Sequence, residues 1–127
     1  MSDPVGEFSL NHVGTTYMKD ANGNLVQYAN FQGTADGFGQ VHGTLILSQA
    51  LADAGASSGT ISWAAKAFQD DGTVLGGFGE GSWEQSSGEQ KWTVNMNTEV
   101  SNGDKLRSEG EISLETLVYS GKIFNAD

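Results

Sequence analysis

The chain alternates between apolar and polar residues over most of its length, and turn-forming dipeptides separate the alternating segments. Segments rich in Thr, Val, Ile, Trp, Tyr and Phe with a two-residue period are typical of half-buried β-strands. The pattern therefore predicts about eight strands. We expect them at residues 6–18, 25–34, 41–48, 59–69, 74–84, 90–100, 105–114 and 116–124.

Glycine-containing dipeptides mark the turns between several of these segments: Asn22-Gly23, Asp71-Gly72, Ser87-Gly88 and Asn102-Gly103. Such pairs tolerate the positive φ angles of tight primed hairpin turns, which predicts that successive strands are antiparallel neighbours. Only residues 48–56 have a helix-favouring composition. Because Gly55 closes that segment, we expect at most a turn or two of helix there.

The glycine and proline content indicates how the strands are arranged. The chain has 18 glycines and one proline among its 127 residues, which suits a continuous and strongly coiled sheet. We therefore expect one all-β domain over residues 1–127, a single antiparallel up-and-down β-barrel of about eight strands. A two-sheet β-sandwich is the alternative architecture.

Alternation also assigns the two faces of each strand. In segment 90–100 the apolar residues Trp92, Val94 and Met96 share one face, and polar residues occupy the other. Elsewhere both faces are apolar, as where Ile46 opposes Leu45. A barrel wall with an exposed apolar patch marks an interaction surface, so we expect a homo-oligomer.

Charge and cysteine content exclude several classes of partner. The chain has 16 acidic and 6 basic residues, a formal net charge of -10. Such a chain repels nucleic-acid backbones and anionic membranes, so neither is an expected partner. Without cysteine, disulfides and thiolate metal sites are excluded. Since the sequence contains neither a signal-peptide pattern nor a membrane-spanning apolar run, we expect a cytoplasmic location.

Two side chains are candidates for proton transfer. His12 shares the parity of Phe8 and can face the barrel interior. If it does, it is either a core histidine or a site residue that exchanges protons near neutral pH. Glu80 shares the parity of Phe78. If that face is the inner one, Glu80 lies among apolar groups and can act as a general acid or base. If the face with Trp83 is the inner one, Glu80 is solvated.

Aromatic residues are the candidates for ligand binding. Trp63, Trp92 and Tyr28 offer large amphipathic surfaces, which serve either as core or as the lining of a pocket for a flat apolar or sugar-like ligand. The histidines lack metal-ligand spacing, and no helix pattern follows the glycine run at 76–81, so we expect neither a metal nor a bound nucleotide cofactor.

The chain resembles the small eight-stranded barrels of the allene-oxide-cyclase-like group, which includes plant cyclases, dirigent proteins and bacterial proteins. The resemblance rests on size, on the glycine-rich segment FQGTADGFGQVHGTL at 31–45 and on the closing YSGKIF at 119–124. It implies a cofactor-free barrel that holds apolar substrates in its interior and forms oligomers. No catalytic residue is transferred from that group to this chain.

Three functions follow from these patterns. The first is a barrel that binds a small apolar or amphipathic molecule, with Trp63, Trp92, Tyr28 and His12 near the pocket. The second is a cofactor-independent isomerase or cyclase, in which Glu80 or His12 moves a proton on a small apolar substrate. The third is a structural or interaction protein with a filled barrel. Strand number does not separate them, because eight strands enclose either side chains alone or one small ligand.

Overall fold

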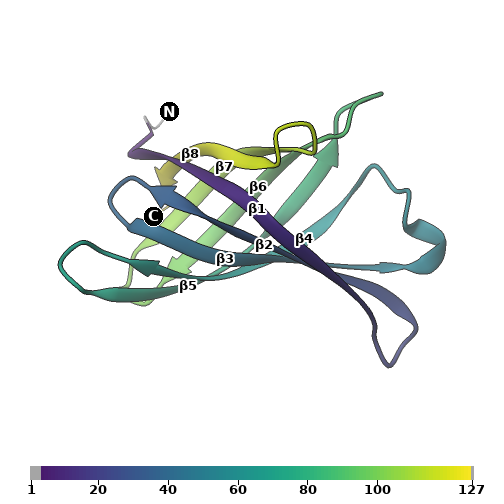
Figure 1. Ribbon diagram of the computed structural model, residues 1–127, viewed down its shortest axis with the longest axis horizontal. Coiled ribbons are helices and arrows are strands. Elements are labelled where there is room, and N and C mark those ends of the chain that lie inside the picture. The colour runs from purple at the N-terminus through teal and green to yellow at the C-terminus, as the bar shows by residue number, and fades with distance from the viewer. Residues whose placement is uncertain (1–3, 127) are drawn as a thin grey trace.

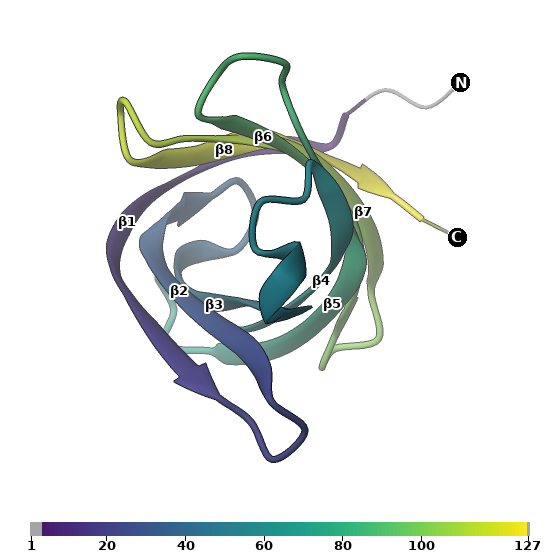
Figure 2. The ribbon, with the colours of Figure 1, turned by 90° about the vertical axis from the view of Figure 1, so that its right-hand side faces the viewer.

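Each strand pairs with its neighbours in sequence, and the last strand returns to pair with the first. The computed structural model describes residues 4–126, which form a closed barrel of eight antiparallel strands (Figures 1 and 2). The strands are β1 (Gly6–Lys19), β2 (Asn24–Ala35), β3 (Gly39–Ala50), β4 (Ser58–Phe68), β5 (Val74–Gln85), β6 (Lys91–Val100), β7 (Lys105–Ser113) and β8 (Val118–Asn125). The predicted up-and-down barrel is confirmed, and the sandwich alternative is wrong.

The hairpin turns lie where the glycine dipeptides predicted them, but their geometry differs. Gly23, Gly72, Gly88 and Gly103 all have positive φ, whereas the residue before each does not. A primed two-residue turn of the Asn-Gly type needs positive φ at both positions, so that turn type is wrong. In the first hairpin the amide of Gly23 donates to the Asp20 carbonyl. This is a three-residue loop in which glycine supplies the left-handed residue.

The connection between β3 and β4 contains the one helical turn within residues 4–126, the 3₁₀ helix η1 (Leu51–Asp53). β3 continues to Ala50, beyond the predicted start of the helical segment, because its residues still pair with β2. Within the described residues, no helix is long and apolar enough to cross a membrane.

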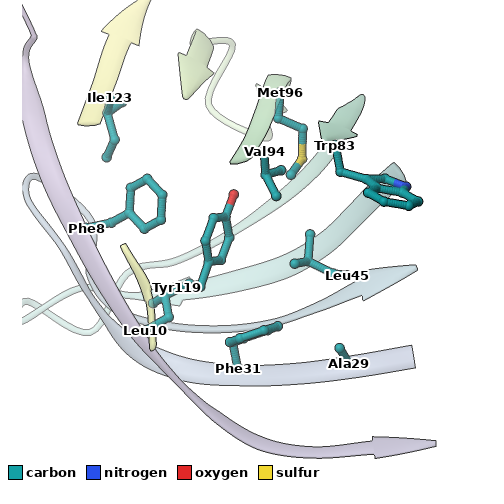
Figure 3. Packing of buried hydrophobic residues seen from close by; sticks show 10 residues of the cluster. All are labelled: Phe8, Leu10, Ala29, Phe31, Leu45, Trp83, Val94, Met96, Tyr119 and Ile123. Carbon is teal, nitrogen blue, oxygen red and sulfur yellow. The ribbon is translucent and has the colours of Figure 1, made fainter. Parts of the chain in front are cut away.

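The core consists of the inward side chains of all eight strands. Its best-buried large members are Phe31 and Val94, and Leu10, Leu45, Met96 and Tyr119 surround them (Figure 3). A strand glycine makes room for the large side chain of Trp63. The indole ring of Trp63 lies across β3 at Gly43, where a Cβ atom would overlap the ring. The strand glycines therefore let a large aromatic side chain lie on bare backbone.

Two phenylalanines on the outer face differ in how they are covered. Phe124 points outward on β8 but is 8% exposed, because the guanidinium of Arg107 lies 4.3 Å above its ring. Glu109 in turn pairs with Arg107. On β5, in contrast, Phe78 is 75% exposed. The barrel thus covers Phe124 on β8 and leaves Phe78 on β5 exposed.

Candidate functional site

A layer of buried side chains divides the barrel interior into two hollows. Phe31, Leu45 and Val94 line one hollow, whereas Met96 and Tyr119 line the other. These residues lie together in the centre of the barrel (Figure 3). The ring centroids of Phe31 and Tyr119 are 5.6 Å apart in an edge-to-face arrangement, so a residue of one hollow's lining packs directly against a residue of the other's.

The larger hollow, which we name the polar cup, has a volume of about 660 Å³. It lies at the end of the barrel that faces the viewer in Figure 2, where η1 lies in front of the opening. Its floor and walls are apolar and comprise Ala29, Phe31, Leu45, Leu47, Ile61, Trp83, Trp92, Val94 and Ile112. Its polar side chains are His12, Thr15, Tyr17, Gln27, Gln49, Gln85, Gln90 and Ser113. The polar cup thus combines an apolar floor with hydrogen-bonding groups.

A β-bulge on β1 brings two of these polar groups together. The pairing of β1 with β2 shifts between His12 and Gly14, which leaves Val13 as the extra, exposed residue. In a regular strand, residues three apart point to opposite faces. Because of the bulge, His12 and Thr15 both line the polar cup, and His12 Nε2 and Thr15 Oγ1 are hydrogen bonded at 2.6 Å. The ring of Phe31 supports the imidazole from the floor, with centroids 5.4 Å apart.

Two tryptophans form a wall of the polar cup. Trp83 on β5 is 7% exposed, and Trp92 on β6 is partly buried beside it in the same lining. The indole of Trp83 lies over bare backbone at Gly59, where a Cβ atom would be 2.9 Å from its nitrogen. This Nε1 atom is buried and has no hydrogen-bond partner within the described chain. The wall therefore contains an unused hydrogen-bond donor.

The second hollow, which we name the apolar cavity, has a volume of about 120 Å³ and lies on the other side of the dividing layer. Phe8, Trp63, Met96, Tyr119 and Ile123 are among its lining residues. Burial raises the pKa of the Tyr119 phenol above its usual range, and a hydrogen bond with Ser108 partly opposes that rise. This end of the interior encloses the smaller, apolar hollow and holds a neutral phenol.

The structure separates the predicted site residues into four places, of which the outer face of β5 holds Glu80. His12 and Trp92 lie together in the polar cup, and Trp63 lines the apolar cavity. Tyr28 is on the outer face of β2, half-buried between Thr16 and Ile46 of the neighbouring strands. Their roles in binding stay predictions.

Glu80 lies on the exposed outer face of β5, because the face that carries Trp83 is the inner one. The condition under which Glu80 becomes a buried acid or base is therefore not met. It lines a shallow outer hollow with Phe78 and Asn97, away from His12.

Sequence reasoning missed several polar-cup residues, and most of them carry a signal. Gln27 has the parity of Ala29 and Phe31, and Gln85 has the parity of Trp83, so alternation alone places both amides inside. Thr15 has the wrong parity relative to His12. Only the bulge turns it inward, and the sequence signal for that bulge is a single glycine, Gly14.

Comparisons with known proteins add no further constraint on the site. No family model, no curated protein and no solved structure matches the chain. The resemblance to allene-oxide-cyclase-like barrels stays a prediction. Within residues 4–126, no three His, Asp or Glu side chains lie together in a way that would hold a metal ion.

Proposed function

We propose that the barrel binds a small, partly apolar molecule in the polar cup. The observation that carries this proposal is the volume of about 660 Å³ with an apolar floor and a set of polar side chains. Ligand sites typically occupy about 300–1,000 Å³ and combine apolar walls with a few polar groups that orient the ligand. The apolar floor favours burial of the ligand body, at roughly 25 cal/mol per Å² of apolar surface removed from water.

The proposal is tested by filling the polar cup without removing any packing contact. Ala29 lies at the floor, and the matched residue Ala67 lines the apolar cavity. The probe is the neutral fluorophore N-phenyl-1-naphthylamine, titrated into the protein. We expect Ala29→Leu to weaken binding at least about tenfold, which is 1.4 kcal/mol, and Ala67→Leu to leave it within about twofold. Equal weakening in both variants, or no binding to the unmodified protein, would contradict the proposal.

A second candidate function is proton transfer on a bound ketone, as in a cofactor-independent isomerase. It is favoured by the hydrogen bond between His12 Nε2 and Thr15 Oγ1, since a histidine held by a hydroxyl group inside a pocket is arranged as a general base. In this step the imidazole removes a proton from the carbon next to the carbonyl and later returns a solvent proton to it. With Glu80 on the outer face, this function depends on His12 alone.

The isomerase candidate is tested by hydrogen–deuterium exchange of the acetyl methyl group of 1-acetonaphthone in deuterated buffer. General acid–base catalysis contributes typically about 10²–10⁴-fold, so exchange in the presence of the protein should be at least about 100-fold faster than in buffer. His12→Gln should abolish the acceleration, whereas His42→Gln, which alters an exposed outer residue, should not. Binding without acceleration would leave the binding function and contradict the isomerase.

The homo-oligomer stays a prediction, and the bare outer face of β4 and β5 is where we expect a second copy to bind. Phe78 is 75% exposed there, and Val74 and Phe68 are 51% and 40% exposed. Sedimentation equilibrium of the unmodified protein should then give a mass above the 13.4 kDa of one chain. Phe78→Ser should shift the equilibrium towards the monomer. A monomer at all concentrations would contradict the prediction.

A further inference from the structure

Within residues 4–126, no formally charged side chain lines the polar cup, although the chain as a whole has 16 acidic and 6 basic residues. Its polar groups are instead neutral amides, hydroxyls and one imidazole, with four glutamines at Gln27, Gln49, Gln85 and Gln90. A bound anion or cation would lose its hydration without gaining a counter-ion, which is strongly unfavourable.

The glutamines and Trp83 define the hydrogen bonds that the polar cup offers. Gln85 Nε2 donates to the Glu89 carbonyl at 2.8 Å, so its Oε1 atom stays available as an acceptor. The Trp83 indole is 7% exposed, and its N–H group is donor-only and has no partner within the described chain. Burying an N–H group without a hydrogen-bond partner costs free energy. A ligand oxygen that accepts a hydrogen bond from this group therefore stabilises the complex more than a hydrogen bond exposed to water would.

We propose that the ligand of the polar cup is an uncharged molecule with a flat apolar body and a carbonyl or hydroxyl oxygen that accepts a hydrogen bond from Trp83 Nε1. The flat body lies on the apolar floor and against the tryptophan wall, where ring stacking is favourable. This inference rests on the proposed binding function and adds the chemical class of the ligand.

Access to the indole nitrogen runs past the start of β4. The nitrogen lies over Gly59, and the exposed residues Ala54, Gly55 and Ala56, which line the polar cup, come shortly before it in the chain. These residues are small and have no buried side chain to displace. Such a hydrogen bond requires a shift of this segment that exposes the N–H group to a ligand oxygen.

Four naphthalenes of nearly equal size separate the contributions of charge and of the acceptor oxygen. 1-Acetonaphthone is neutral and has a carbonyl oxygen, 1-ethylnaphthalene lacks the oxygen, 1-naphthoate is an anion and 1-naphthylmethylammonium is a cation. Isothermal titration calorimetry at neutral pH should give the tightest binding for 1-acetonaphthone. We expect binding about five- to tenfold weaker for 1-ethylnaphthalene and more than about tenfold weaker for either ion.

Trp83→Phe keeps an aromatic ring and removes the donor. In this variant the preference for 1-acetonaphthone over 1-ethylnaphthalene should disappear, while 1-ethylnaphthalene binds as before. Trp63→Phe, which alters the apolar cavity, is the matched control and should keep the preference. A measurement on the unmodified protein does not depend on the variant folding: the ¹H–¹⁵N cross-peak of the Trp83 indole should move downfield with 1-acetonaphthone and stay in place with 1-ethylnaphthalene.

The outcomes distinguish the inference from the proposed function. If the four naphthalenes bind equally well and Ala29→Leu abolishes their binding, the polar cup is a binding site but the inferred ligand class is wrong. The same holds if the ketone preference survives Trp83→Phe or if an ion binds most tightly. If none of the four binds, both the inference and the proposed function are overturned.

Discussion

The two ends of the barrel interior share one packing arrangement but enclose hollows that differ in size and lining. At each end a tryptophan lies on a glycine of the neighbouring strand, Trp63 on Gly43 and Trp83 on Gly59. The Trp63 ring packs edge-to-face against Tyr119, with centroids 6.3 Å apart, and the hollow beside it is about 120 Å³. Trp83 instead lines a hollow of about 660 Å³ and keeps a free N–H group. One end encloses a small apolar hollow, whereas the other encloses a larger hollow that polar side chains also line.

The largest expected effect follows from adding one methyl group beneath each tryptophan. Neither Gly43 nor Gly59 has a positive φ, so alanine introduces no backbone strain and only the contact with the indole is tested. At Gly43 the methyl group meets the Trp63 ring and the side chain of Ala65, and the ring is held against Tyr119 beside the smaller of the two hollows. We expect Gly43→Ala to lower the free energy of unfolding by about 2–3 kcal/mol, which is typical of overpacking.

Gly59→Ala is the matched variant, and we expect it to lower the free energy of unfolding by less than about 1 kcal/mol, because the Trp83 ring can shift towards the polar cup. Urea unfolding followed by tryptophan fluorescence measures both values. Trp63→Leu combined with Gly43→Ala should recover part of the loss, since a smaller side chain then lies on β3. Equal losses at the two glycines would contradict the expected difference between the two ends.

A smaller effect concerns the buried phenol of Tyr119, which lines the apolar cavity. Burial raises the pKa of Tyr119 above the ordinary value of 10.0. A raised folded-state pKa means that the stabilisation is complete below the ordinary value and is lost as the pH rises above it. The unmodified protein should therefore lose stability to urea above about pH 10. Tyr119→Phe should lack that loss and cost about 1 kcal/mol at neutral pH through the hydrogen bond with Ser108.

The control for this alkaline effect is Tyr17→Phe. Tyr17 is 61% exposed at the rim of the polar cup, so its removal should leave the pH dependence of the unmodified protein in place. If Tyr119→Phe follows the unmodified protein through the alkaline range, the phenol is not the group that couples folding to pH at this end of the barrel.

The contrast between the two ends also explains how much the sequence could predict. Strand positions and the closed meander follow from alternation and from turn glycines such as Gly23 and Gly103, because these are local properties of the chain. Local alternation also allowed an inward His12, which lines the polar cup. The turn type was wrong because a three-residue loop and a primed two-residue turn share the same Asn-Gly signal.

The site was less predictable, since it depends on how far each strand is displaced along its neighbours. Alternation gives the face of Trp63 and Trp92 but not the level in the barrel at which each side chain lies. Alternation therefore predicted one pocket for both tryptophans, whereas they line two separate hollows. The hydrogen bond between His12 and Thr15 depends on a bulge that alternation by itself contradicts. The choice between the two faces at Glu80 needed the neighbouring strands to settle it.

The smallest expected effect compares the hairpins at the two ends. Asp20, in the β1–β2 hairpin beside the polar cup, accepts hydrogen bonds from the backbone amides of Asn24 and Asn22, and the amide of Asn24 is the main cause of its lowered pKa. In the β4–β5 hairpin at the other end, the backbone amide of Thr73 is the main cause of the lowered pKa of Asp71. Asp71 is exposed and Asp20 is only partly buried, so both effects are small.

A lowered folded-state pKa means that the stabilisation is present above the ordinary value of 3.8 and is lost as the pH falls through it. Thermal unfolding followed by circular dichroism, at about pH 5 and again below about pH 3, should therefore show less acid sensitivity in Asp20→Asn than in the unmodified protein. Asp71→Asn should show a smaller difference, because fewer neighbouring groups donate to that carboxylate. A larger effect at Asp71 would mean that the β4–β5 hairpin depends more on its turn carboxylate, which would reverse the order that the hydrogen bonds predict.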